Sequence, residues 1–264
     1  MTEKPVIYTD AYYARLFEVE ERHWWCLGMR AVAAALLRAV LGAPRPRLVL
    51  DAGCGSGASL VWLEEFAAGG GVHGIDLAIE ALRFSRSRGL RRLAQASVLA
   101  LPFRSERFDL VVSVDVFQHL PVGGGDAAAV REAFRVLAPG GQFLLRTNCA
   151  APGRRNRPEF VDFHWYAERE ARALLERGGF EVVRSTHANV VADVAARARA
   201  VAASALGRGA GRPTGSGLPE PPPQRSLAHS LLLRTMRLEA GWVGAGGAIP
   251  SGGSLLLLGR KPRG

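Results

Sequence analysis

The sequence predicts an α/β fold in which helices cover both faces of a mainly parallel sheet. Short apolar segments of strand length alternate with segments of helical periodicity along most of the 264 residues. One segment, FDLVVSV at 108–114, is apolar at nearly every position, which is typical of a strand buried on both faces. A glycine-rich turn, GCGSG at 53–57, connects the first strand to a helix. Together these features predict a doubly wound sheet with right-handed crossovers.

The individual elements follow from apolar spacing and from the glycine and proline residues that end them. An aromatic and acidic stretch leads into an Ala/Leu run, which predicts one helix over 8–41 that ends at Gly42-Ala43-Pro44. The expected strands are 48–50, 72–75, a weak strand at 92–96, 108–114, 142–146, 180–184 and 254–258. The expected helices between them are 58–67, 78–88, 126–137 and 167–177.

An insertion over 190–250 separates the last two expected strands. It contains an Ala/Arg helix, a segment rich in Gly and Pro with a candidate hinge at 213–223, and an amphipathic helix over about 224–240. We expect this last helix to carry Leu227, Leu231, Met236 and Leu238 largely on one side. Three interpretations stay open: the apolar side packs on the domain, it caps an acceptor site, or the basic, apolar helix rests on a membrane.

The net charge of +10 comes almost entirely from arginine, because lysine occurs only at Lys4 and Lys261. Arginine is spread along the chain, and Ala and Gly are abundant, which favours a coding bias over a groove for nucleic acid. We therefore expect no nucleic-acid partner.

The three cysteines form no CxxC pair, which argues against a disulfide framework and against a zinc site. Their number and spacing suit a reducing compartment, so a cytoplasmic location is expected. The run over 31–41 is too short to cross a bilayer and contains Arg38, so we expect no transmembrane segment. The sequence leaves the oligomeric state undetermined.

The segment LVLDAGCGSG at 48–57 carries the chemistry. Its glycines let the backbone turn tightly near a ligand, and the next helix directs its N-terminus at the same spot. As G-x-G-x-x-A it could hold a dinucleotide, but Asp51 would repel a pyrophosphate. Asp51 suits an ammonium group instead, and S-adenosylmethionine (SAM) carries both an ammonium and a carboxylate. Asp76 ends the second strand, where a carboxylate can accept hydrogen bonds from ribose hydroxyls of either ligand.

Four segments in order, DAGCGSG, HGIDLA, LALPFRSERFDLVVS and EAFRVLAPGGQFLL, resemble the class I SAM-dependent methyltransferases of the small-molecule, type 11-like group. The resemblance covers about 45–150 and implies a Rossmann-like sheet of seven strands with the last strand antiparallel. The chain is accordingly expected to divide into an N-terminal helical lid at 1–44 and a methyltransferase domain at 45–264, with the 190–250 insertion within it as a candidate helical cap.

The resemblance also implies a cofactor site for SAM, with S-adenosylhomocysteine as product. Asp51 and the glycine loop would hold the methionine portion, Asp76 the ribose, and Leu77 would pack on the adenine. The family often has an acid that accepts from the adenine amino group where this chain has Ser97, so we expect adenine recognition here to depend more on the backbone groups of Val98 and Leu99. The residues assigned to the cofactor are Asp51, Gly53, Cys54, Gly55, Gly57, Asp76, Leu77, Ser97, Val98, Leu99 and Asp115.

The end of the fourth strand, SVDVFQHLP, lacks the Asn/Asp-Pro-Pro-aromatic segment typical of methylases that act on amide or base nitrogens. His119 lies there, at the edge where doubly wound folds bind ligands, and could act as a general base for a hydroxyl. The alternative is a histidine at a helix start that only shapes the pocket.

Two aromatic segments are candidates for the acceptor site. ERHWWCLGMR at 21–30 resembles a lid segment of some bacterial members of the group, although Trp24 and Trp25 could equally be buried under a helix. His164, Trp165 and Tyr166 could line the acceptor site or could serve packing.

The favoured function is O-methylation of a small-molecule acceptor, in a bacterial natural-product, glycan or lipid pathway. The alternatives are a SAM-binding protein without catalysis and an NAD(P)-binding oxidoreductase. The chain lacks the Tyr-x-x-x-Lys pair that some members of the latter class carry.

Overall fold

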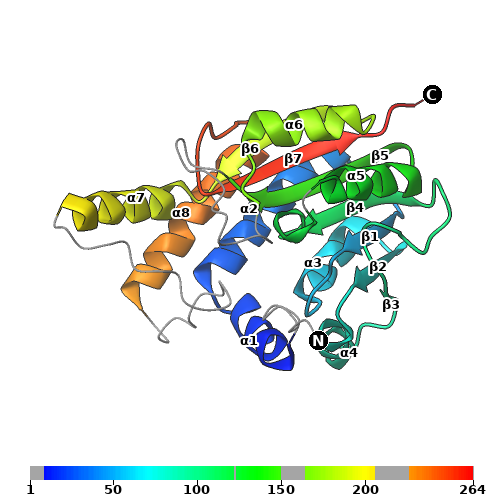
Figure 1. Cartoon of the computed structure of the whole chain (residues 1–264), viewed down its shortest axis with the longest axis horizontal. Helices are drawn as coiled ribbons and strands as arrows, with labels where there is room; N and C mark the ends of the chain where they lie inside the picture. The colour runs from blue at the N-terminus through cyan, green and yellow to red at the C-terminus, as the bar shows by residue number, and fades with distance from the viewer. Residues whose placement is uncertain (1–8, 122, 150–163, 206–225, 264) are drawn as a thin grey trace.

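The computed structural model describes residues 9–121, 123–149, 164–205 and 226–263 (Figure 1). Seven strands form one sheet in the order β3-β2-β1-β4-β5-β7-β6, and β7 runs antiparallel to both of its neighbours. The strands are β1 Leu48–Ala52, β2 Gly71–Asp76, β3 Leu93–Gln95, β4 Phe108–Val114, β5 Leu137–Asn148, β6 Glu181–Ala188 and β7 Ser254–Arg260. The predicted fold class is confirmed. The candidate hinge at 213–223 lies outside the described residues.

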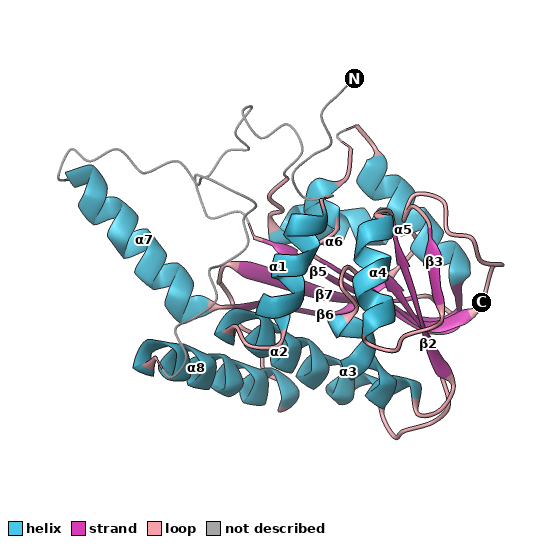
Figure 2. Ribbon diagram, turned by 90° about the horizontal axis from the view of Figure 1, so that it is seen from below, coloured by secondary structure: helices cyan, strands magenta, loops and turns pink. Residues whose placement is uncertain are grey.

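Helices cover both faces of the sheet, as Figure 1 shows. The long helices are α1 Asp10–Glu20, α2 Trp24–Leu41, α3 Ala58–Ala67, α4 Ile79–Ser87, α5 Gly125–Val136, α6 Glu168–Arg177, α7 Val190–Ala205 and α8 Leu227–Gly244. Helices α2, α3, α4 and α8 share one hydrophobic core with the sheet, while α5 and α6 share the other. Helix α7 projects away from the sheet, which is clearest in Figure 2.

Strand β4 is buried on both faces, as its apolar sequence predicted. Leu110 and Val112 lie in the core beneath α2 and α3, and Phe108 and Val111 lie in the core beneath α5 and α6. The central position of β4 between β1 and β5 explains the pattern, because neither face of a central strand meets solvent. Its carboxyl end, with that of β1, defines the edge where the candidate site lies.

The expected single helix over 8–41 is wrong, because the chain breaks into α1 and α2. His23 takes an extended backbone (φ −74°, ψ 131°), and its Nδ1 accepts a hydrogen bond from the N–H of Trp25 at 3.2 Å. His23 therefore acts as the N-cap of α2, although histidine is not among the residue types that are preferred at N-caps. The break lets α1 lie against α4 while α2 packs on the sheet (Figure 2).

The expected apolar side of α8 is also wrong in part. Met236 is buried together with Ala240 and Val243, whereas Leu227 and Leu231 are exposed on another side of the helix. The contact with α2 decides this arrangement, because a Cβ on Gly28 would come 2.5 Å from the Cβ of Met236. Glycine at that position lets the two helices approach closely, and Met236 fills the space.

Helix α2 is the one described helix that is long and apolar enough to cross a bilayer by composition. Its buried residues, which include Val32, Leu36 and Leu37, pack into the core of this domain. A core helix of that kind passes the same compositional test, so the finding carries little weight for a membrane span.

Candidate cofactor and acceptor site

The glycine loop after β1 needs its glycines for backbone geometry and for packing inside the protein. Gly53, Gly55 and Gly57 have φ of 98°, 53° and 86°, a left-handed region that other residues avoid. A Cβ on Gly53 would also collide with Val116, and a Cβ on Gly57 would come 2.8 Å from the side chain of Ser85. At two of the three glycines, close packing against other side chains of the protein therefore also leaves no room for a Cβ.

Asp51 is fully buried at the end of β1. One carboxylate oxygen accepts a hydrogen bond from the hydroxyl of Ser59, and the other, Oδ1, has no partner within the described part of the chain. Burial raises the pKa of Asp51 to about 7. A buried carboxylate oxygen without a donor is costly unless a ligand supplies one. The site thus fits a cationic donor such as an ammonium group.

Asp76 ties the end of β2 to the glycine loop. Its two oxygens accept the N–H groups of Gly55 and Ala78, each at 2.9 Å. Burial raises the pKa of Asp76, while these backbone hydrogen bonds and one from the Tyr13 side chain oppose the rise. The next residue, Leu77, is largely exposed beside this carboxylate.

Helix α1 lies over the glycine loop; it belongs to the 1–44 segment expected as a lid, although the resemblance placed the lid at 21–30. Tyr13 reaches Asp76, and Leu16 is 3.5 Å from the position that a Cβ on Gly55 would take. Glu20 accepts a hydrogen bond from the Ser56 hydroxyl, and burial raises the pKa of Glu20 to about 7. The aromatic and acidic spacing of 10–20 was the only available signal for these contacts. The covering element is therefore α1, whereas Trp24 and Trp25 start the core helix α2.

Two residues assigned to the cofactor turn their side chains to the protein instead. The thiol of Cys54 is buried against β2, 2.9 Å from where a Cβ on Gly74 would lie, and only its backbone belongs to the loop surface. The hydroxyl of Ser97 accepts the N–H of Leu99 at 3.1 Å and so stabilises its own turn. Val98 and Leu99, within this turn, are half-buried.

An ion pair with a buried arginine links the carboxyl ends of β4 and β5. Asp115, with φ of 57°, pairs with Arg146, whose guanidinium also donates to the Ser254 hydroxyl at 3.2 Å. The amide of Gln118 donates to the other Asp115 oxygen at 3.2 Å. Trp25 covers the Arg146 guanidinium at 4.5 Å from the ring centroid. Sequence reasoning assigned Asp115 to the cofactor and Trp25 to the acceptor site, and it did not single out Arg146 or Gln118, which looked like ordinary strand and loop residues.

The remaining acceptor-side residues lie close to this network. His119 ends a short 3₁₀ helix, Phe117–His119, directly after β4, and is half-buried. The N–H of His164 donates to the Gln118 carbonyl at 2.8 Å, which brings that segment to the same edge, and Trp165 is half-buried. Tyr166 is buried in the core and donates to the Phe117 carbonyl at 3.3 Å, which favours its packing role over contact with an acceptor.

Comparison with known proteins agrees with this geometry. Residues 50–145 match a family described as "Methyltransferase domain". The chain therefore contains a methyltransferase domain over these residues. The match contains the end of β1, the glycine loop, Asp76 and β4, which are the elements that build the candidate cofactor edge.

Curated relatives share mainly this domain. A SAM-dependent methyltransferase of Mycolicibacterium smegmatis is 31% identical over 166 residues, 61% of each chain. Demethylmenaquinone methyltransferase of Thermus thermophilus is 36% identical over 121 residues, 44% of this chain and 51% of the relative. "Probable tRNA methyltransferase 9B" of Bos taurus is 34% identical over 100 residues, 37% of this chain and 20% of the relative. The chain thus spans less than two thirds of each of these relatives.

Solved structures show the same fold over nearly the whole chain. The methyltransferase in a complex with the Haloferax volcanii Trm112 activator has a TM-score of 0.61 at 20% identity, covering 96% of this chain and 97% of that one. Phosphoethanolamine N-methyltransferase 2 of Haemonchus contortus has a TM-score of 0.59 at 17% identity, covering 97% of this chain and 59% of that one. The latter was solved with S-adenosylhomocysteine and, separately, with SAM.

The residues present at this edge fit SAM as a cofactor. The unpartnered oxygen of Asp51 offers an acceptor for an ammonium group, and the loop over 53–57 leads to the N-terminus of α3, which favours a carboxylate. Within the described residues, no cluster of His, Cys, Asp and Glu side chains could hold a metal ion.

Proposed function

We propose that the methyltransferase domain transfers the methyl group of SAM to an oxygen of a small-molecule acceptor in the cytoplasm, within a bacterial natural-product, glycan or lipid pathway. The buried, unpartnered oxygen of Asp51 is the observation that supports this most directly. The ammonium group on the methionine portion of SAM would supply the hydrogen-bond donor that this oxygen lacks. A dinucleotide would bring a pyrophosphate to the same loop and leave Asp51 with a repulsive neighbour.

The proposed roles follow the order of the elements along the edge. Asp51 holds the ammonium group, Asp76 the ribose hydroxyls, and the exposed Leu77 packs on the adenine. SAM supplies a methyl group activated by its positively charged sulfur. His119, at the end of β4, takes the proton from the acceptor hydroxyl as the oxygen attacks. Holding the nucleophile in line with the methyl group is the other contribution required of the protein.

SAM affinity is expected to rise with pH up to about 7. In the free protein, burial raises the pKa of Asp51 to about 7, so the carboxyl is protonated below that pH. An ammonium group prefers the ionised form, so affinity should fall by up to about tenfold for each pH unit below 7. Calorimetric titration with SAM from pH 5 to 8 measures this dependence.

Two variants separate Asp51 from its neighbour Glu20, whose pKa is also raised to about 7. Asp51→Asn should bind SAM weakly with little change over this pH range, whereas Glu20→Gln should keep the dependence. A pH-independent wild-type affinity would contradict the proposed ammonium contact.

Replacing His119 by alanine is expected to lower turnover by about 100-fold or more, because general-base assistance is lost. SAM affinity should stay unchanged, since His119 lies on the acceptor side. Full turnover in the variant would reduce His119 to a residue that shapes the pocket.

Two measurements test the proposed function as a whole. Calorimetry with SAM, S-adenosylhomocysteine and NAD should show binding of the first two alone, and tighter binding of NAD would contradict the assignment. A screen with methyl-labelled SAM against hydroxylated metabolites should then find an acceptor.

RNA is a second candidate acceptor, because a relative named for tRNA methylation shares 34% identity over 100 residues and the chain has a net charge of +10. The screen therefore includes tRNA. Label in tRNA and in no metabolite would replace the small-molecule proposal.

A further inference from the structure

A row of large apolar side chains faces solvent along α8. Leu227, Leu231, Leu238 and Trp242, here called the outer row, are 88%, 63%, 75% and 60% exposed. Their spacing of four, seven and four residues places them on one side of an α-helix. Contiguous apolar surface of this kind on a monomer commonly marks an interaction site.

Apart from Trp242, whose indole N–H donates to the Ala248 carbonyl at 3.2 Å, the outer row is not needed to hold α8 in place. The opposite side of the helix, through Met236, Ala240 and Val243, makes the buried contact with α2 and the core. A surface helix normally has polar residues on the side away from its core. Because α8 is apolar on that side as well, the outer row fits a contact with something other than the described domain.

Positive charge borders the outer row. Arg234 and Arg237 are exposed on α8, and the single acid of this helix, Glu239, accepts the N–H groups of Asn189 and Val190 at 2.7 and 2.9 Å. Glu239 therefore serves the start of α7, and the exposed charge of α8 is basic. Basic side chains beside an apolar row complement the anionic headgroups and hydrocarbon of a bilayer surface.

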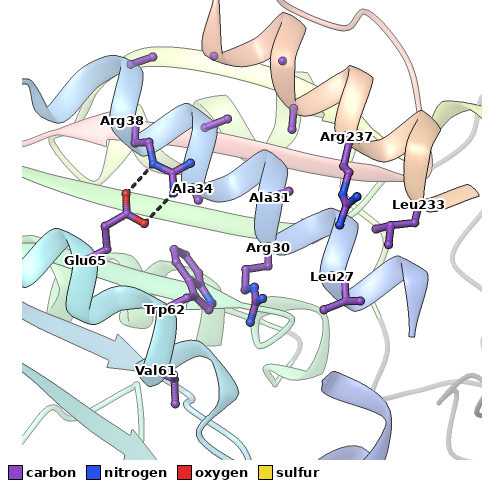
Figure 3. A pocket seen from close by; sticks show the side chains of 15 residues that line it. Leu27, Arg30, Ala31, Ala34, Arg38, Val61, Trp62, Glu65, Leu233 and Arg237 are labelled. Atoms are coloured by element: carbon purple, nitrogen blue, oxygen red, sulfur yellow. Dashed lines mark hydrogen bonds and ion pairs between the residues drawn. The ribbon is translucent and has the colours of Figure 1, made fainter. Parts of the chain in front are cut away.

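An open groove of about 900 Å³ runs beside this basic border, between α2, α3 and α8 (Figure 3). Arg30 and Arg237 line it together with small residues such as Ala31 and Ala34, while Arg38 is paired with Glu65. None of the residues assigned to the cofactor lines this groove, so it is separate from the SAM edge. Arg30 extends the basic border onto α2.

The outer row lies in the insertion that borders the acceptor side of the domain. Helix α7 starts directly after β6 and also exposes Val191, Val194 and Val201. The beginning of α8 approaches the beginning of α2, where burial and then the nearby His229 lower the pKa of His23 to about 4. From there α2 continues into Trp25, which covers Arg146 at the sheet edge.

We propose that the outer row docks on a bilayer that contains anionic lipids, with Arg234 and Arg237 against the headgroups. A second copy of the chain fits the row less well. Arg234 lies near the middle of the row, so antiparallel pairing about a two-fold axis would oppose the two guanidinium groups. Docking would bring the acceptor edge to the membrane, and, resting on the proposed function, this makes the acceptor a lipid or lipid-linked molecule with a free hydroxyl.

Sedimentation of the full chain with vesicles tests the docking alone. The wild type should pellet with vesicles of phosphatidylcholine and phosphatidylglycerol, and less with phosphatidylcholine alone, and added salt should weaken the binding. Leu231→Glu/Leu238→Glu should lower partitioning by about tenfold or more, because both side chains leave the apolar contact. These residues are exposed, so the variant should fold and bind SAM as the wild type does, and calorimetry with SAM checks this.

A charge-matched control separates the apolar contact from net charge. Arg131→Ala/Arg177→Ala removes two positive charges from exposed positions of α5 and α6, on the opposite face of the sheet. This control should keep most of the binding to anionic vesicles.

Wild-type protein that stays in solution, or equal losses in the two double variants, would overturn the proposal. A wild-type dimer by light scattering that Leu231→Glu/Leu238→Glu converts to monomer would assign the row to a second copy. None of these results depends on methyl transfer, so failure here leaves the proposed function standing.

Discussion

Replacing Asp76 by alanine should lower SAM affinity by about 100-fold or more, since each hydrogen bond from a ribose hydroxyl to an ionised carboxylate contributes about 1.5–3 kcal/mol. The same carboxylate accepts the N–H groups of Gly55 and Ala78, so its removal also loosens the loop that would hold the methionine portion. Calorimetric titration with SAM measures the loss. An unchanged affinity would show that Asp76 is not the ribose ligand.

The conservative variant Asp76→Asn distinguishes the ligand contact from the loop contact. The asparagine oxygen can still accept one backbone N–H, so the loop should be held better than in Asp76→Ala. Its SAM affinity should lie between those of the wild type and the alanine variant. Thermal unfolding without SAM, compared among the three proteins, shows how much of the effect is structural.

Replacing Asp115 is expected to lower the free energy of unfolding by more than replacing its ion-pair partner Arg146 does. The Arg146 side chain is 2% exposed and that of Asp115 is 30% exposed. Asp115→Gly leaves a buried guanidinium without its counter-charge, and this should cost about 3–5 kcal/mol of unfolding free energy. Glycine avoids a penalty from the backbone, because Asp115 already has φ of 57°.

Arg146→Met is the matching variant. It leaves a carboxylate that water can reach and that Gln118 still contacts, and the methionine fills apolar space under Trp25. It should therefore cost less than Asp115→Gly. Denaturant unfolding of the two variants without SAM measures the difference, and a larger cost for Arg146→Met would contradict the assignment of Arg146 as the buried partner.

The cofactor edge could be predicted because its residues come from short, local patterns. Asp51 and the glycine loop are adjacent in sequence, and Asp76 ends the neighbouring parallel strand. Parallel strands bring their carboxyl ends to one edge, so residues at those ends meet without further information. The number of strands and the antiparallel β7 followed from the resemblance that these same segments carry, whereas the order of the strands was not predicted.

The covering helix and the ion pair could not be predicted in this way. Arg146 and Asp115 are separated by 31 residues, and nothing in RTN or SVD marks either as a partner. Tyr13 and Glu20 reach Asp76 and Ser56 only because His23 breaks the helix and turns α1 over the loop. A histidine N-cap is recognisable once its Nδ1 is seen to accept the N–H of Trp25, and not from its residue type.

The sequence by itself therefore determined the sheet, the loop and the two carboxylates at its edge, because backbone periodicity, glycine conformation and strand polarity are local properties. Only the tertiary structure decided which side of α8 is buried, which helix covers the glycine loop and that Arg146 pairs with Asp115. Those outcomes depend on close approach between distant segments, such as Gly28 with Met236, and such packing is decided by the shapes that meet rather than by the pattern of either segment.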